Sequence, residues 1–513
     1  MIPIPKHPPD IYVQIRETAR RFAEDRIRPH AGDLDESEAF PADIYDEMAE
    51  LGLFGITVPD DYGGAGLDTL SYALVMEELS RGYASIADQC GLIELIGTLL
   101  SVHGNERQRG LYLADALSAR KRVAYCITEA EAGTDVSGIR TTAERDGSGF
   151  RLSGTKMWIH NAPVADFAYV LARTDAALGN RGMSIFIVDL DQNGVARGKK
   201  EKKMGQRASP VGALHFDEVR LSADALLGPL NRGFHIMMSA LDKGRIGIAA
   251  LAIGIAQAGL EAALDYAKTR KQFGKPIAEN QGLQWMLADM QKDITAGRSL
   301  VHRAAMTMDG GFPATMDCAI AKCFAGDTAV QHTANAVQIF GGSGYIRGFE
   351  VERLYRDHCA RIAQGLTMAS GLEASIGQRV SFSKTVSESD VYLFAGITGD
   401  FAPNHVDEQF MRQTQYGRRI AHGALLVGYM SRASTMIVEK MAGEGAALYP
   451  VSLGYDRVRF LKPVFIGDTI TVTYVVTGCD SDRNRTTANI EVTNEGGEVV
   501  AVATHIMKWL PTG

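Results

Sequence analysis

Residues 396–426, GITGDFAPNHVDEQFMRQTQYGRRIAHGALL, place an acid and a base five positions apart in a loop that contains a proline. The acid is Asp400 and the base is His405. The apolar residues that follow predict a buried helix over residues 422–442. A carboxylate and an imidazole in a proline-bent loop can hold one water molecule between them. The stretch therefore predicts an acid/base pair that acts on water, beside one long helix.

Apolar and polar residues alternate after this helix, most clearly over residues 470–476, and this period of two predicts strands with one buried face. Residues 494–497 supply a hairpin turn between two such strands. One helix against a curled sheet is the fold predicted for residues 385–513. Residues 371–384 lack the apolar period and are rich in Gly and Ser, so they are predicted to be a linker.

The residues before this linker differ in character and divide into three parts. Apolar residues recur every three to four positions in the first part, which predicts an α-helical domain at residues 1–120. The period falls to two between residues 121 and 230, where Gly-rich turns indicate a small antiparallel β domain. Long helices rich in Gly and Ala return at residues 231–370, and small residues of this kind allow the close packing of a helical bundle.

Composition excludes several classes of function. The chain has 513 residues, 46% of them hydrophobic and 22% charged, with a net charge of -8. This length predicts several domains. The sequence contains no run of about 20 uncharged apolar residues, so no membrane span is predicted. It contains no cluster of basic residues, so a nucleic-acid partner is not expected. The six cysteines form no CxxC pair, so neither a disulfide framework nor a metal site is expected. The N-terminus shows no export signal, and a cytoplasmic location is expected.

Five motifs in the first 370 residues resemble those of the acyl-CoA dehydrogenases. They are YCITEAEAGTDVSGI at 125–139, GTKMWIHNA at 154–162, RKQFGKPI at 270–277, QIFGGSGY at 338–345 and LYRD at 354–357. The resemblance implies a multidomain α+β fold with an N-terminal α-helical domain, a middle β-barrel and a C-terminal four-helix bundle. It also implies FAD as the cofactor, a CoA thioester as the substrate and an electron-transferring flavoprotein as the electron acceptor.

Residues in these motifs have the chemistry that a flavin site requires. Hydroxyl and backbone groups at Thr128 and Thr134 can hydrogen-bond the edge of a flavin, and Trp158 offers a flat face to its rings. Arg270 can pair with a pyrophosphate. Taken singly, each is more often an ordinary core or surface residue, so the prediction depends on the set. The predicted cofactor-binding residues are Thr128, Thr134, Trp158, His160, Arg270, Phe273, Gln338, Gly341 and Gly342.

The resemblance also assigns residues to neighbouring molecules. It implies that Arg270, Phe273 and Gln338 reach the FAD of another subunit, so a homo-oligomer, dimer or tetramer, is predicted. Arg245 is assigned to binding of the CoA thioester. His160 departs from the family pattern, which often has Thr at this position near the flavin.

The base that removes the alpha proton in this family is absent from its usual positions. The usual Glu after the LYRD motif is Gln364 here, and the second position used by some members is Gly244. An amide cannot accept a proton at neutral pH. Glu94 or Asp88 is the candidate substitute. The alternatives are that this part of the chain catalyses a reaction without an alpha-proton base, or that it binds thioesters without turnover.

The C-terminal residues resemble the MaoC-like (R)-specific enoyl-CoA hydratases, whose hot-dog fold wraps a curved sheet around one helix. The matching segments are GITGDFAPNHVDEQF at 396–410, YGRRIAHG at 416–423 and VRFLKPVFIGDTI at 458–470. Asn404 stands where the family usually has an apolar residue. The resemblance implies that the helix start polarises the thioester carbonyl. The residues assigned to catalysis are Asp400, His405 and Gly423.

Together these features predict a bifunctional enzyme of acyl-CoA metabolism. An FAD-dependent dehydrogenase-like part would convert an acyl-CoA to the 2-enoyl-CoA, and a hydratase part would convert that product to the (R)-3-hydroxyacyl-CoA. The alternative is that the flavin part is a redox-neutral lyase or a non-catalytic thioester-binding scaffold, with hydration as the main activity. The sequence does not determine the length or branching of the acyl chain.

Overall fold

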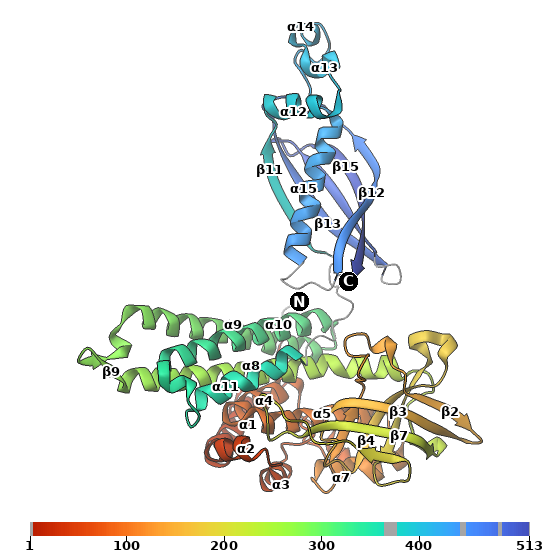
Figure 1. Cartoon of the computed structure of the whole chain (residues 1–513), viewed down its shortest axis with the longest axis vertical. Helices are drawn as coiled ribbons and strands as arrows, with labels where there is room; N and C mark the ends of the chain where they lie inside the picture. Colours follow the sequence, from red (N-terminus) through yellow and green to blue (C-terminus); the bar gives the residue numbers. More distant parts are fainter. Residues whose placement is uncertain (1–3, 364–376, 442–447, 481–484, 512–513) are drawn as a thin grey trace. The chain divides into compact units, whose positions relative to one another are not determined.

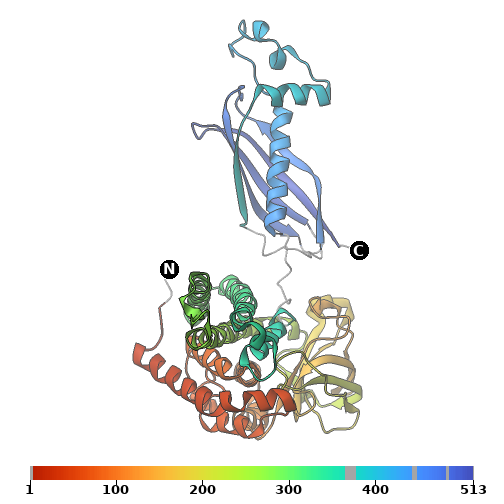
Figure 2. The same cartoon turned by 60° about the vertical axis from the view of Figure 1, so that its left-hand side comes forward.

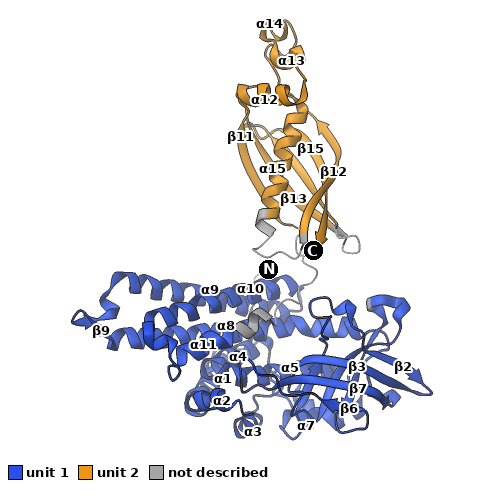
Figure 3. Cartoon of the chain, viewed as in Figure 1, with its two compact units in different colours: residues 1–367 blue, residues 368–513 orange. Residues whose placement is uncertain are grey.

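The computed structural model describes residues 4–363, 377–441, 448–480 and 485–511. The chain forms two compact units, residues 1–367 (unit 1) and residues 368–513 (unit 2), which Figure 3 shows in blue and orange. Unit 1 contains two hydrophobic cores and unit 2 contains one. Each unit therefore buries its own apolar residues.

The first part of unit 1 is helical, as predicted. Its central helices are α4 (Thr69–Gly82) and α5 (Ala84–His103), and nearly all residues of α4 are buried, because other helices surround it. Asp68 begins α4 by accepting a hydrogen bond from Ser71 N at 2.9 Å, which is a typical N-cap. The remaining helices of this part are α1 (Pro9–Phe22), α2 (Ala31–Ser37), α3 (Ala42–Glu50), α6 (Glu106–Gln108) and α7 (Ala114–Leu117).

Four longer helices follow the middle sheet and lie side by side in Figures 1 and 2. Glycines let the first of them, α8, pack closely on α4. A Cβ at Gly247 would lie 1.9 Å from Tyr72 Oη, and a Cβ at Gly254 would lie 1.9 Å from Ser80 Oγ. The small residues that predicted close helix packing therefore do contact a neighbouring helix. The elements are α8 (Gly233–Thr269), β9 (Lys271–Gln272), β10 (Lys275–Pro276), α9 (Gln281–Asp309), α10 (Thr315–Phe340) and α11 (Glu350–Ala363).

The middle part of unit 1 is a single eight-stranded sheet in the order β6-β7-β3-β2-β4-β5-β8, with β1 paired to β4. The prediction of an antiparallel sheet is wrong at two places, because β1 and β2 both pair with β4 in parallel. Parallel pairing requires a long connection. The chain between β1 and β4 includes β2 and β3, and the chain between β2 and β4 includes β3. The strands are β1 (Val123–Cys126), β2 (Thr142–Asp146), β3 (Gly149–His160), β4 (Phe167–Arg173), β5 (Met183–Asp189), β6 (Val195–Arg197), β7 (Val211–Leu221) and β8 (Leu226–Leu227).

The sheet and the bundle meet where the loop before β7 crosses α11. A Cβ at Gly205 would lie 2.2 Å from the carbonyl oxygen of Arg356, so only Gly allows this approach. Asp357 is fully buried at the crossing, and its Oδ1 accepts a hydrogen bond from Gln206 N at 2.5 Å. Among the described residues, its Oδ2 has no hydrogen-bond partner. Burial raises the pKa of Asp357 to about 6, and the hydrogen bond from Gln206 N and the charge of Arg353 partly oppose this effect.

The buried carboxyl of Asp357 predicts a pH-dependent stability of unit 1. The folded state holds this proton more tightly than the unfolded chain, so the free energy of unfolding falls as the pH rises between about 4 and 6. In Asp357→Asn, which mimics the protonated acid, this contribution is absent. Relative to the variant, we expect the free energy of unfolding of the wild type to fall by on the order of 2–3 kcal/mol between acid and neutral pH. Urea unfolding followed by Trp fluorescence measures this, and a pH-independent difference would contradict it.

Unit 2 wraps a five-stranded antiparallel sheet, in the order β11-β13-β14-β15-β12, around helix α15. Figure 2 shows this helix lying along the curved sheet. Alternate residues such as Ile470, Val472, Tyr474 and Val476 are buried, as the period of two predicted. The elements are β11 (Arg379–Thr385), α12 (Glu388–Thr398), α13 (Pro403–Val406), α14 (Glu408–Met411), α15 (Gly423–Met441), β12 (Leu448–Phe460), β13 (Thr469–Asp480), β14 (Arg485–Thr493) and β15 (Val499–Pro511).

Two expectations about the chain change with the structure. The linker predicted at residues 371–384 is shorter, because Arg379–Thr385 forms β11 and pairs with β13. The residues of β11 are alternately half-buried and exposed, and they include charged residues, which weakened the strand pattern. Among the described residues, α5 and α8 are long and apolar enough to cross a membrane when a few charges are tolerated. Most of each apolar window is buried inside the protein, as in core helices.

Candidate functional site

A bulge in β3 exposes Trp158. The pairing of β3 with β7 shifts register between Lys156 and Ile159, and a bulge of this kind re-aims side chains. Trp158 has φ 55°, and its residue surface is 56% exposed. A large aromatic residue held open in a left-handed backbone conformation is unusual for a core position. The structure therefore presents the predicted flavin-stacking side chain at the surface of unit 1.

The segment with Thr128 lies beside this bulge. Thr128 O accepts a hydrogen bond from Met157 N at 3.0 Å, so the segment is attached to β3 next to Trp158. Thr128 is half-buried and Thr134 is exposed. Beneath them, the fully buried Lys156 donates to Glu129 Oε1 at 2.8 Å. This ion pair anchors the segment that bears the predicted flavin contacts.

A second group of predicted cofactor-binding residues lies at the far end of the bundle. The last turn of α8 and the end of α10 meet there, because Tyr266 stacks on Phe340 with ring centroids 4.1 Å apart. In Figure 1 the β9 hairpin lies at the end of the bundle remote from β3. The exposed residues at this end are Arg270, Phe273, Gln338, Gly341 and Gly342, with Phe273 99% exposed.

Glu94, the first candidate for a substitute base, is enclosed and paired. It is 1% exposed, accepts hydrogen bonds from Thr57 N and lies 3.3 Å from Lys243 Nζ. These partners indicate that Glu94 belongs to a structural ion pair and is not a base that faces an acyl chain. Arg245, predicted to bind substrate, is paired with Asp242 one turn earlier on α8.

Asp88, the second candidate, lies nearer the predicted flavin contacts. Its Oδ2 accepts from Ser209 Oγ at 2.9 Å and lies 3.4 Å from His160 Nε2. His160 is the last residue of β3, two positions after Trp158. Gln364, the position of the missing base, lies outside the described residues.

In unit 2, Asp400 and His405 come together with a third residue, His422. One ligand atom of each lies within 4.8 Å of those of the other two. His405 and His422 are buried and their rings stack with centroids 3.7 Å apart, whereas the Asp400 side chain is half exposed. His422 Nε2 donates to Asp400 O at 2.9 Å. His422 thus fixes the loop that carries the acid and supports the ring of the base.

Sequence reasoning identified His422 only as the start of a helix. The signal that could have found its role is the His of the motif YGRRIAHG, which is the second His after Asp400, because a buried imidazole needs a polar partner. The loop that supplies this partner is distant along the chain.

The three side chains have the composition of a metal site but not its geometry. Nearly parallel stacked rings, 25° apart, direct their nitrogen lone pairs alongside each other instead of toward one point. His405 Nδ1 also donates to Ile420 O at 2.8 Å, which leaves Nε2 as its unprotonated nitrogen when the ring is neutral. The group is better suited to proton transfer than to holding an ion.

Gly423 begins α15 beside these side chains. A Cβ at this position would lie 2.8 Å from two ring carbons of Phe460, so any larger residue displaces the ring or the helix start. A backbone N–H here lies at the positive end of a 19-residue helix, where developing negative charge is stabilised.

For the hydratase role that the sequence predicts, replacing Gly423 with Ala is expected to lower the rate of hydration about tenfold, because the helix start shifts away from the reacting carbonyl. Removing the obstructing ring in Gly423→Ala/Phe460→Ala is expected to restore much of the rate. Gly428→Ala is the matched control, because a Cβ there meets nothing within 4 Å. Steady-state hydration of crotonyl-CoA measures all three. Equal losses in the single and double variants would contradict the steric explanation.

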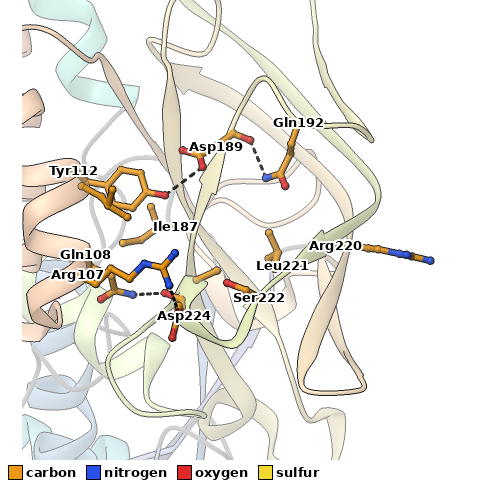
Figure 4. Close-up of a pocket in the computed structure, with 12 residues that line it drawn as sticks. Arg107, Gln108, Tyr112, Ile187, Asp189, Gln192, Arg220, Leu221, Ser222 and Asp224 are labelled. Atoms are coloured by element: carbon orange, nitrogen blue, oxygen red, sulfur yellow. Dashed lines mark hydrogen bonds and ion pairs between the residues drawn. The ribbon is translucent and has the colours of Figure 1, made fainter.

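Unit 1 also has a shallow cavity of about 210 Å³, between the N-terminal helices and the sheet. Figure 4 shows polar side chains around it that pair with one another, including Arg107 with Asp224 and Tyr112 with Asp189. None of the predicted site residues lines it. This cavity is therefore separate from both candidate sites.

Comparison with known proteins agrees with both units. Residues 10–120, 124–219 and 231–369 match the family models for the N-terminal, middle and C-terminal domains of acyl-CoA dehydrogenase. The chain belongs to the acyl-CoA dehydrogenase family. Residues 372–498 match the family model described as a MaoC like domain. The predicted combination of an acyl-CoA dehydrogenase fold with a MaoC-like domain is confirmed.

Relatives of unit 1 include reductases and dehydrogenases. The chain is 43% identical to a 3-(aryl)acrylate reductase of Clostridium sporogenes over 345 residues, 67% of this chain and 91% of that protein. It is 42% identical to a subunit of a caffeyl-CoA reductase-Etf complex of Acetobacterium woodii over 346 residues, with the same coverage. The solved butyryl-CoA dehydrogenase of Megasphaera elsdenii has a TM-score of 0.69 and 38% identity, covering 71% of this chain and 97% of that one.

Members of the acyl-CoA dehydrogenase family are FAD-binding flavoproteins, which confirms FAD as the cofactor expected for unit 1. The residues present fit the group. Trp158 offers an exposed aromatic face, and Thr134 an exposed hydroxyl. Cβ positions at Gly341 and Gly342 point into open space, where a ligand can approach the backbone.

Proposed function

We propose that this chain is a two-activity enzyme of acyl-CoA metabolism. Unit 2 hydrates a 2-enoyl-CoA to the (R)-3-hydroxyacyl-CoA, and unit 1 is an FAD-dependent oxidoreductase acting on acyl-CoA thioesters. The observation that carries the proposal is the placement of Asp400 and His405, whose ligand atoms lie within 4.8 Å. One water molecule fits within hydrogen-bonding reach of both at this separation.

The proposed hydration depends on which ring nitrogen of His405 has the proton. Its Nδ1–H is held by Ile420 O, so Nε2 bears the lone pair that takes a proton from the bound water. The water oxygen then bonds to the beta carbon of the thioester, and the Asp400–His405 pair returns the proton to the alpha carbon. The N-terminus of α15 at Gly423 stabilises the oxygen of the intermediate enolate. Asn404 Nδ2 lies 3.0 Å from His405 Nε2, so this amide must move aside before the water can use the single lone pair of that nitrogen.

Unit 1 requires a second copy of the chain. Figure 1 shows β3, which contains Trp158, and β9, which precedes Phe273, on opposite sides of unit 1, so we infer that one chain does not place both groups on a single FAD. A homo-oligomer, in which Arg270, Phe273 and Gln338 complete a neighbour's site, satisfies both groups. FAD supplies hydride acceptance when bound. An electron-transferring flavoprotein is the proposed redox partner, in line with the relative that belongs to an Etf complex.

The proposed oxidation is tested by anaerobic mixing of the purified protein with saturated acyl-CoAs of different length and branching. Bleaching of the flavin band supports dehydrogenation. Gln364→Glu restores a carboxylate at the family's position and is expected to raise the rate of bleaching, by as much as about 10²–10⁴-fold. Gln291→Glu is the matched control, because it introduces the same charge at an exposed position of α9 that is not a predicted site residue. An unchanged rate in Gln364→Glu would show that the base lies elsewhere.

The absence of an acid at residues 364 and 244 favours one second candidate, a redox-neutral lyase that eliminates a beta leaving group and feeds the alkene to unit 2. Release of the leaving group without bleaching would identify it. A protein that purifies without FAD would instead indicate a thioester-binding scaffold.

A further inference from the structure

His160 ends β3 within a buried polar cluster. Its Nε2 lies 2.9 Å from Gln89 Nε2 and 2.7 Å from Ser209 Oγ. Asn161, Gln89 and Ser209 are each at most 1% exposed. Polar groups enclosed in this way adopt hydrogen-bond orientations that satisfy one another. The cluster can therefore be followed from one group to the next.

The orientation of the cluster begins at a backbone carbonyl. Val123 O lies 3.4 Å from Asn161 Nδ2, so this amide directs its NH₂ group toward the carbonyl and toward Gln89 Oε1 at 2.8 Å. Asn161 Oδ1 in turn accepts from Gln89 Nε2 at 2.9 Å. Rotating either amide would bring like groups together. The reciprocal pair thereby fixes Gln89 with its NH₂ group next to His160.

A fixed N–H donor next to His160 Nε2 decides the tautomer of the imidazole. If Nε2 carried a proton, two N–H groups would face each other at 2.9 Å. An unprotonated Nε2 instead accepts from Gln89 and leaves the proton on Nδ1. Among the described residues, Nδ1 has no hydrogen-bond partner, and it is not among the enclosed unpaired atoms. The exposed 18% of the His160 side chain therefore includes a donor that is available to a ligand.

The charges that face His160 come from two elements. Asp88 on α5 lies 3.4 Å from Nε2, and Lys203 approaches from the loop before β7. Burial lowers the pKa of His160, Asp88 opposes this effect and Lys203 adds to it. Ser209 has one proton, which it donates to Asp88 or to Nε2. The lowered pKa favours the neutral ring.

We propose that His160 is a hydrogen-bond donor to the flavin through its Nδ1–H, and that Gln89 is the positioning residue that sets this tautomer. The inference rests on the proposed role of unit 1 as a flavoprotein. The proposal explains why His160 can stand where the family often has Thr, because an imidazole N–H replaces a hydroxyl as the donor. It also adds a group that can titrate beside the cofactor, which a hydroxyl cannot do.

Nitrogen NMR of the full-length protein with ¹⁵N-labelled histidine tests the tautomer directly, because the two ring nitrogens have different shifts when protonated. The signal is assigned by its loss in His160→Asn. We expect an Nδ1–H ring in the wild type, with or without FAD. An Nε2–H ring or an imidazolium at neutral pH would overturn the proposal.

Gln89→Glu tests the positioning role, because it replaces the donor with a charged acceptor. We expect the His160 ring to change to the Nε2–H tautomer or to imidazolium. Its proton affinity should rise by about 10- to 1,000-fold. The midpoint potential of bound FAD should then depend on pH through this titration. Gln192→Glu is the matched control, because Gln192 also donates to a neighbour, Asp189 O, on the same sheet.

Two results separate this inference from the proposed function. A protein that binds FAD but has an Nε2–H ring at His160 refutes the inference alone. A protein that binds no FAD refutes the flavoprotein role, while the NMR measurement still reports the tautomer. A flavin potential that is unaffected by Gln89→Glu, in protein whose His160 ring has changed tautomer, refutes the contact with the flavin.

Discussion

Asp400→Asn is expected to lower the rate of hydration of crotonyl-CoA by about 10²–10⁴-fold, the usual contribution of a positioned acid or base. The carboxylate is half exposed, and one of its oxygens lies within 4.8 Å of a ring nitrogen of His405, close enough for the proposed water to bridge them. An amide of the same shape keeps the backbone oxygen that accepts from His422, so the loop is retained. The loss is expected in kcat, with the KM for the thioester nearly unchanged.

Asp407→Asn is the matched control for this variant. Asp407 lies in the same segment and caps α14 by accepting from Phe410 N at 3.0 Å, a role that Asn also performs. The control should hydrate crotonyl-CoA at close to the wild-type rate. FAD content and flavin reduction, which belong to unit 1, should be unchanged in both variants. Equal activity of Asp400→Asn and Asp407→Asn would remove Asp400 from the mechanism.

Lys156→Met is expected to destabilise unit 1 by about 3–5 kcal/mol, because it leaves the charge of Glu129 unpaired in the interior. Lys156 is fully buried and donates to both Glu129 and Ile127 O at 2.8 Å. Burial lowers the pKa of this lysine, and Glu129 partly opposes the effect. Because Glu129 follows Thr128, the variant should also bind less FAD.

Lys156→Met/Glu129→Gln tests the cause of this loss, because the double variant has no unpaired charge. We expect it to regain part of the lost stability and FAD content. Lys292→Met is the exposed control, since its pair with Asp289 at 2.8 Å lies at the surface, where ion pairs contribute little to stability. Urea unfolding followed by flavin fluorescence measures all three. A double variant less stable than Lys156→Met would contradict the unpaired-charge explanation.

Elements with a strong local period were predictable. The helix over residues 422–442 is α15 (Gly423–Met441), and the alternating segment at residues 470–476 lies within β13. Strand β11 was predicted as linker, because its residues are only half-buried on one side and pair with β13, which follows far along the chain. Sequence periodicity reports burial, so a strand with little burial gives a weak signal.

The candidate sites were predictable where their residues are close in sequence. Asp400 and His405 share one loop, and Thr128, Thr134, Trp158 and His160 belong to two motifs. The supporting residues were not predictable, because they come from other elements: Ile420 holds His405 from 15 residues away. Gln89 gives no sequence signal of its own, since a buried amide in a helix resembles any other polar residue.

By itself, the sequence determined the two-unit organisation, the flavin motifs and the candidate acid and base of the proposed hydratase site. These depend on residue types at fixed local spacing, which the covalent chain imposes. Only the tertiary structure decided that Glu94 is enclosed by Lys243, that His422 stacks on His405 and that Gln89 orients His160 across 71 residues. Those outcomes depend on packing that removes water from particular polar groups. Each buried group must then hydrogen-bond a residue that the fold brings near, whatever its position in the sequence.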